Sequence, residues 1–156
     1  MTRPVTRWPL PDPMARALDE ARAAARAGEV PIGAVIVREG AVLASAHNLT
    51  RAMADPTAHA ELLAIREAAR KLGNERLDGC DLWVTLEPCP MCAGAIAHAR
   101  LARVYYAASD PKGGGVEHGA RVFEHPQCLH RPEVYAGVGE SEAAELMRGF
   151  FRERRS

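Results

Sequence analysis

The chain has 156 residues, with 20 basic and 20 acidic side chains and no formal net charge. A chain of this length buries about 70% of its unfolded surface without disulfides, so we expect one domain over residues 1–156, and its neutrality does not favour a general nucleic-acid binder. Two of its four cysteines form a C-x-x-C, the other two lie in unrelated contexts, and no apolar run could span a bilayer, so we expect a cytoplasmic protein with no membrane partner. We also expect no nucleotide cofactor.

The first third of the chain predicts a helix followed by a hairpin. Asp12-Pro13 can cap a helix, and the alanine-rich stretch to Ala27 ends at Gly28. Apolar β-branched residues then fill 32–37, and an apolar run continues over 41–46 after a turn at 39–40.

The rest of the chain alternates between helical and extended patterns. The expected elements are a helix from Thr57 or Ala58 to Leu72, a strand at 81–86, a helix from about Pro90 to His98, a strand at 103–107, a loop over 109–132, a weak strand candidate at 134–138 and a final helix capped by Ser141. This alternation indicates an α/β layered domain whose sheet is covered on both faces.

Two short motifs supply candidate metal ligands. His59-Ala60-Glu61 and Pro88-Cys89-Pro90-Met91-Cys92 together offer one histidine and two cysteines. Three protein ligands leave the fourth tetrahedral position of zinc open for water, as in catalytic sites, and the combined pattern is the signature of zinc nucleobase deaminases. The alternatives are a redox dithiol or a chance pairing. A zinc ribbon would need a second C-x-x-C, which the chain lacks.

The spacing of these residues restricts where the site can lie. Within a helix, His59 and Glu61 would point about 200° apart, so they can serve one site only where a helix begins. Cys89 and Cys92 share one face of the first turn of the next helix. The zinc is therefore expected between two helix N-termini, which favour thiolates. Zinc lowers the pKa of bound water to about 7, and Glu61 is placed to carry the protons.

These motifs make the chain resemble the TadA-type tRNA adenosine deaminases of the cytidine deaminase-like superfamily. Three further segments share in the resemblance: Val30-Pro31-Ile32-Gly33-Ala34-Val35, Met91-Cys92-Ala93-Gly94-Ala95-Ile96 and the closing Phe-Phe-Arg. The resemblance runs from the first helix to the last. It implies a three-layer α/β/α sandwich with a mixed central sheet of about five strands. It also implies one Zn²⁺ per chain, a homodimer, and a tRNA anticodon arm whose flipped-out wobble adenine is attacked at C6 by zinc-bound hydroxide, forming inosine.

The resemblance assigns a role to each residue of the chemical site. It makes His59, Cys89 and Cys92 the zinc ligands and Glu61 the proton shuttle. Asn48 matches an asparagine that hydrogen-bonds the flipped purine, a task that suits an amide because it both donates and accepts. The plainer interpretation of Asn48 is an ordinary residue at the end of a strand.

The resemblance also implies residues that contact RNA outside the base pocket. Asp110 and Lys112 match a loop beside the neighbouring anticodon nucleotides, and Phe150, Phe151 and Arg152 match an RNA-facing terminal helix. The cationic, aromatic stretch that continues to Arg155 suits phosphate contact and base stacking. The plainer alternatives are a turn at Asp110-Pro111 and core packing of the phenylalanines.

Some features separate the chain from the commonest family pattern, and some leave the substrate open. Residues 113–118 and the later His125, Cys128 and His130 depart from that pattern. We expect surface or packing roles for them, because their spacing does not repeat as metal ligands would.

Free-base guanine deaminases share both zinc motifs, so only Val84-Thr85-Leu86-Glu87 and the tail separate tRNA from a rival substrate such as guanine, cytosine or cytidine. A binding module with structural zinc is disfavoured by Glu61 and by the missing fourth ligand.

Overall fold

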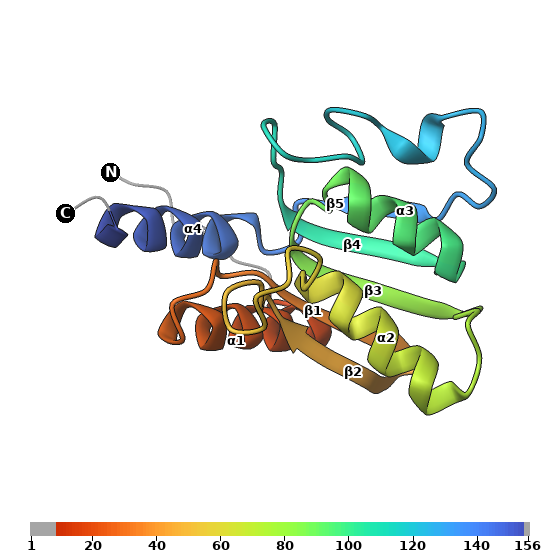
Figure 1. Ribbon diagram of the computed structural model, residues 1–156, viewed down its shortest axis with the longest axis horizontal. Helices are drawn as coiled ribbons and strands as arrows, with labels where there is room; N and C mark the ends of the chain where they lie inside the picture. The colour runs from red at the N-terminus through yellow and green to blue at the C-terminus, as the bar shows by residue number, and fades with distance from the viewer. Residues whose placement is uncertain (1–8, 155–156) are drawn as a thin grey trace.

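The computed structural model describes residues 9–154. The N-terminal residues 1–8 and residues 155–156, which include Arg155 of the cationic tail, lie outside it. The described chain folds into α1 (Asp12–Arg26), β1 (Gly33–Arg38), β2 (Ala41–His47), α2 (Ala60–Leu72), β3 (Cys80–Leu86), α3 (Pro90–Ala99), β4 (Arg103–Ala108), the 3₁₀ turn η1 (Val122–Glu124), β5 (Glu133–Ala136) and α4 (Glu140–Arg154) (Figure 1). None of these helices is long and apolar enough to cross a membrane.

The five strands form one mixed sheet in the order β2-β1-β3-β4-β5. β1 is antiparallel to both β2 and β3, whereas β3, β4 and β5 are parallel. Gly33 at the start of β1 pairs with His47 at the end of β2, and Ala34 pairs with Val84 near the end of β3. The start of β1 and the ends of β2 and β3 therefore meet at one end of the sheet.

The two faces of the sheet bury two separate sets of side chains. Alternate residues of a strand point to opposite faces. Val35 and Val37 pack with residues of α1 and α4, while Ala34 and Ile36 pack with residues of α2 and α3. The three-layer α/β/α sandwich with a mixed five-stranded sheet is thus confirmed.

α1 lies directly against β1 at Gly33. A Cβ atom at this position would stand 2.0 Å from the carbonyl oxygen of Ala17, so only glycine permits the contact. The amide of Gly33 donates a hydrogen bond to the hydroxyl of Thr85 at 3.1 Å, which fixes the start of β1 against the end of β3.

α2 begins later than predicted, for a local reason. Asp55 accepts hydrogen bonds from the backbone N–H and the hydroxyl of Thr57, at 2.8 and 2.7 Å. Such side-chain turns compete with helical hydrogen bonding. The helix therefore starts at Ala60, and His59 becomes its extended N-cap residue.

Smaller differences occur at the other ends. α1 is preceded by Pro11 as the N-cap, so Asp12 is its first helical residue and not its cap. α4 begins at Glu140, which places Ser141 inside the helix. β5 ends at Ala136, short of the predicted 138, because Gly137 takes the left-handed conformation with φ of 82°.

Candidate metal centre and active site

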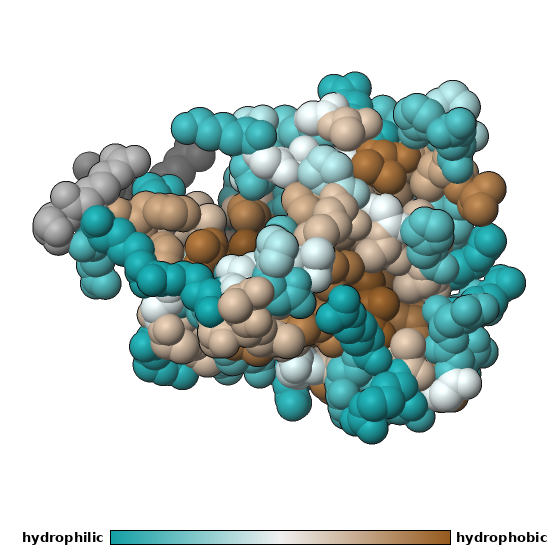
Figure 2. Space-filling model, in the orientation of Figure 1, coloured by the Kyte–Doolittle hydropathy of each residue, from teal (hydrophilic) through white to brown (hydrophobic). Residues whose placement is uncertain are grey.

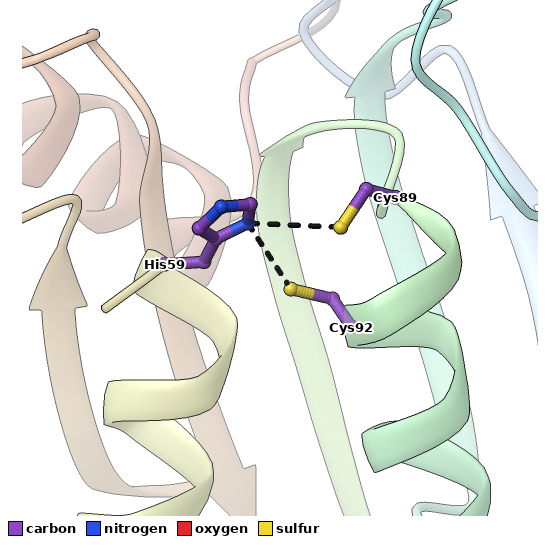
Figure 3. Close-up of side chains that lie close together, drawn as sticks. All are labelled: His59, Cys89 and Cys92. Carbon is purple, nitrogen blue, oxygen red and sulfur yellow. Dashed lines mark hydrogen bonds between the residues drawn. The ribbon is translucent and has the colours of Figure 1, made fainter. Parts of the chain in front are cut away.

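Three potential metal ligands converge at the N-termini of α2 and α3. His59 is the N-cap of α2, Cys89 is the N-cap of α3, and Cys92 lies in the first turn of α3. The Nδ1 atom of His59 lies 3.6 Å from Sγ of Cys89 and 3.5 Å from Sγ of Cys92 (Figure 3). Within residues 9–154, they form the one group of three or more His, Cys, Asp or Glu side chains that could hold a metal.

The separations and the chemistry of these atoms fit zinc. A tetrahedral zinc with bonds of about 2.0–2.1 Å to nitrogen and about 2.3 Å to sulfur holds those atoms about 3.6 Å apart. Both His59 Nδ1–Sγ distances agree with this value. One imidazole and two thiols form a borderline-soft donor set, which suits zinc better than magnesium or calcium.

The two cysteines differ in how readily they ionise. Contact with the Cys92 thiol lowers the pKa of Cys89 to about 4, and the His59 ring acts in the same direction. The same contact raises the pKa of Cys92, and burial adds to the rise. A cation bound at this site would favour the thiolate form of both cysteines.

Glu61 lies beside the three ligands but is not one of them. Its side chain belongs to the first turn of α2, and only 3% of the residue is exposed. Burial raises the pKa of the carboxyl group. Among the buried side-chain nitrogen and oxygen atoms of the described chain, Oε1 of Glu61 is the one without a hydrogen-bond partner. Orphaned buried polar atoms are rare, and a catalytic role, a bound water or an ion is the usual explanation for one.

Asn48 is held near the same helix terminus. It follows β2, is 5% exposed, and its N–H donates to the carbonyl of Ile32 at 3.1 Å. The next amide, that of Leu49, donates to the carbonyl of Ala58 at 3.0 Å, and Ala58 directly precedes His59. The backbone of Asn48 therefore lies at the edge of the metal centre.

Sequence reasoning missed the role of Glu87 as a structural acceptor. Its buried carboxylate accepts hydrogen bonds from the N–H of Asp110 and from the ring N–H of His118, at 3.0 and 2.7 Å. Three further N–H groups, those of Val116, Glu117 and His118, donate to its other oxygen at 3.0–3.2 Å. Burial opposes ionisation, but these hydrogen bonds together lower the pKa of Glu87. One side chain thus organises the whole segment 110–118.

The glycines of this segment explain how it fits. A Cβ on Gly114 would lie 2.5 Å from Oε2 of Glu87, and one on Gly115 would lie 2.6 Å from the backbone nitrogen of Pro90. The N–H of Gly115 donates to the carbonyl of Pro88 at 2.8 Å. The segment is therefore packed on the turn that carries Cys89. Two features of the sequence could have indicated this arrangement: an acidic residue, Glu87, directly after a buried strand, and the three consecutive glycines at 113–115.

The extra histidines and the extra cysteine of the loop have structural contacts. The ring of His130 donates to the carbonyl of Leu101 at 2.7 Å, and the Cys128 thiol donates to the carbonyl of His130 at 3.1 Å. Nδ1 of His125 accepts the N–H of Gln127. These contacts agree with the expected packing roles.

The residues predicted to contact RNA are only partly gathered. Asp110, Phe151 and Arg152 line one hollow of about 580 Å³ between the end of β4 and α4. Lys112 is exposed and does not line it; its N–H and that of Gly113 donate to Oδ1 of Asp110, so the predicted turn is present as well. Phe150 packs against Phe151, with ring centroids 5.3 Å apart.

The comparisons with known proteins agree with this fold and site. A family model described as MafB19-like deaminase matches residues 11–155. The fold and the ligand set thus define a deaminase of the cytidine deaminase-like class. The chain is 58% identical over 142 residues to the tRNA-specific adenosine deaminase of Agrobacterium fabrum, covering 91% of this chain and 93% of that protein. It belongs to the TadA-type tRNA-specific adenosine deaminase family.

Solved structures extend the comparison. One, from a study of A-to-I editing by tRNA:A34 deaminases at the wobble position of transfer RNA, has 57% identity and a TM-score of 0.85, covering 86% of this chain and 97% of its own. A guanine deaminase from Bacillus subtilis has 48% identity and a TM-score of 0.61, covering 62% of each chain. The likeness to this particular guanine deaminase covers less of the chain and has a lower TM-score.

Proposed function

We propose that this chain is a zinc-dependent hydrolase that converts adenosine to inosine at the wobble position of a tRNA anticodon. Water replaces the amino group at C6 of adenine, and ammonia leaves. The observation that carries the proposal is the three-ligand group of His59, Cys89 and Cys92 beside the buried, unpartnered oxygen of Glu61. Membership of the tRNA-specific adenosine deaminase family supports the substrate.

The chain's residues divide the chemical work. His59, Cys89 and Cys92 would hold one zinc ion, a Lewis acid that lowers the pKa of a coordinated water to about 7. Glu61 accepts one proton of the attacking water at Oε1 and delivers it to a ring nitrogen of the base. It then carries the second proton of that water, from the new C6 hydroxyl, to the amino group, which leaves as ammonia. The raised pKa of the buried Glu61 suits a group that must alternate between both protonation states.

Recognition of the substrate falls to residues around this centre. Asn48 is proposed to hydrogen-bond the edge of the flipped adenine, because an amide can donate and accept together. The hollow lined by Asp110, Phe151 and Arg152 offers an acceptor, an aromatic ring and a cation to neighbouring nucleotides. Lys112 and Phe150 are proposed to extend this surface.

We also propose that the active form is a homodimer. Small and apolar side chains gather over α3 and between α2 and α3, bordered by hydrophilic ones (Figure 2). Met91 at the start of α3 is 38% exposed and Leu129 is 78% exposed. Monomers rarely leave contiguous apolar patches open to water. Light scattering across a concentration series tests this; a monomer at every concentration would contradict it.

Incubation of the purified protein with anticodon stem-loops and, separately, with free guanine, cytosine, adenosine and cytidine tests the function. Inosine and ammonia should form from the stem-loop alone. Truncation after Gly149 removes Phe150, Phe151 and Arg152, and should abolish stem-loop deamination while zinc content stays unchanged. A protein that deaminates free bases and is insensitive to this truncation is instead a free-base or nucleoside deaminase.

A further inference from the structure

Two arginines from distant parts of the chain meet at one backbone carbonyl. Arg51 Nη1 donates to the carbonyl oxygen of Gly28 at 3.3 Å, and Arg154 Nη2 donates to the same oxygen at 2.7 Å. Both side chains are exposed, and neither forms an ion pair with an acidic residue in the 9–154 region. Two guanidinium groups are thus held side by side, and the nearby Glu29 carboxylate accepts backbone N–H groups and not either guanidinium.

The surroundings hold both guanidinium groups in place. Gly28 adopts φ of 80°, and a Cβ there would lie 3.1 Å from Arg154 Nη2, so glycine allows the close approach. The Arg154 guanidinium also lies 4.5 Å from the centre of the Phe150 ring. The backbone of residue 51 is fixed because the N–H groups of Arg51 and Ala52 donate to the buried Glu29 carboxylate, at 3.0 and 2.7 Å.

Capping of α1 explains only part of this arrangement. Cations near the C-terminus of a helix are favourable, and Gly28 follows the C-cap of α1. One guanidinium would serve that purpose, however, and a second adds like-charge repulsion. Each arginine carries five N–H donors, and the contacts with Gly28 use one nitrogen of each. The remaining donors suit an anionic ligand with several acceptor oxygens.

The pair lies at the same end of the sheet as the metal centre. The Gly28 turn leads into β1, whose first residue pairs with His47, the neighbour of Asn48. Arg51 follows Asn48 by three residues, and Arg154 follows Arg152 by two. A surface hollow of about 420 Å³, lined by Gly28, Glu29 and Arg51 among others, lies beside the pair.

We propose that Arg51 and Arg154 form a phosphate-binding pair that contacts the RNA backbone next to the deaminated nucleotide. The inference rests on the proposed function, because it takes RNA as the ligand. Guanidinium groups match phosphate oxygens in charge and geometry, and donors already held in position lose less entropy on binding. The pair joins the loop after Asn48 to α4, so one phosphate can contact both.

The test measures binding of an inosine-containing product stem-loop, which the enzyme does not consume, over a series of KCl concentrations. Arg51→Gln and Arg154→Gln keep N–H donors for Gly28 but remove the charge. The double variant should weaken binding by about tenfold or more and reduce the slope of log Kd against log salt by about one. Each single variant should have a smaller effect, since the other guanidinium still neutralises the phosphate. Arg76→Gln, which removes a partner of Asp78 between α2 and β3, is the matched control.

The possible results separate the inference from the function. An unchanged salt slope with a lowered melting temperature would make the arginines helix caps and overturn the inference alone. Weaker binding of adenosine 5′-monophosphate without a change in stem-loop affinity would assign the pair to a free nucleotide, and also overturn it. If the unmodified protein neither binds nor deaminates the stem-loop, the proposed function fails and the inference fails with it.

Discussion

The metal centre and α4 contrast in how firmly the fold holds them. Around the centre, Cys92, Glu61 and Glu87 are buried, and Glu87 alone accepts five hydrogen bonds. In α4 only Ala143 is fully buried, and Phe151 is 43% exposed. Groups proposed to perform the chemistry are therefore preorganised, whereas those proposed to select the substrate lie on a peripheral helix.

Removal of a proposed zinc ligand should have the largest effect, because it disrupts the metal centre, the more firmly held of the two regions. Cys89→Ala should reduce zinc content from about one per chain to near zero and abolish deamination, because two ligands hold zinc poorly. Cys128→Ala is the control, since that thiol donates only to a carbonyl. Metal analysis by mass spectrometry decides the matter, and full zinc occupancy in Cys89→Ala would refute the ligand assignment.

Glu61→Gln separates catalysis from stability. Turnover should fall by about 10²–10⁴-fold, because the amide cannot carry protons. The melting temperature should stay the same or rise, since Oε1 makes no hydrogen bond in the fold. Glu67→Gln, on the same helix but paired with Arg70, provides the control. Near-normal turnover by Glu61→Gln would exclude the proton-shuttle role.

Glu87→Gln tests whether one carboxylate organises the wall of the site. An amide nitrogen in place of an oxygen faces N–H donors, so the free energy of unfolding should fall by about 3–5 kcal/mol. His118→Ala removes a single donor and should cost about 1–3 kcal/mol. Urea unfolding measures both changes. Equal losses for the two variants would show that the hydrogen bonds do not act through Glu87.

Asn48→Ala tests a residue at the edge of the metal centre that is proposed to bind the substrate. If the amide pairs with the purine, kcat/KM on the stem-loop should fall by the equivalent of about 1–3 kcal/mol, with zinc content unchanged. Asn74→Ala, on the loop after α2, should have no effect. Unchanged kcat/KM would return Asn48 to the role of an ordinary residue at the end of a strand.

Tyr106 gives a smaller effect that depends on pH. Burial raises its pKa, as does the hydrogen bond from its hydroxyl to Glu117. In the unfolded chain the phenol ionises above about pH 10. Its contribution to stability is therefore complete below pH 10 and is lost as the pH rises through the folded pKa. Unfolding measured from pH 8 to 11 should show a steeper decline for the unmodified protein than for Tyr106→Phe; parallel curves would contradict this.

Much of the fold follows from the sequence because its causes are local. Gly28 and Gly73 end their helices as predicted, and the apolar runs became strands, of which β1, β3 and β4 are largely buried. The start of α2 was misplaced because the turn at Asp55 competes with the helix. The gathering of His59, Cys89 and Cys92 was predicted because all three belong to short motifs.

Other parts of the site depend on contacts between distant segments. The five donors to Glu87 come from a loop more than 20 residues away, and the meeting of Arg51 and Arg154 at Gly28 depends on how α4 is placed. Periodicity and motif spacing carry no signal for such contacts. The resemblance to a family supplied candidates for the RNA surface, but not their arrangement.

The contact between Gly28 and Arg154 also has a consequence for synthesis of the chain. It joins residues 126 positions apart, so the ribosome must add nearly all of the sequence before it can form. The three proposed metal ligands lie within residues 59–92 and are synthesised much earlier. The residues proposed to hold the metal can therefore leave the ribosome while the surface proposed for RNA is still incomplete.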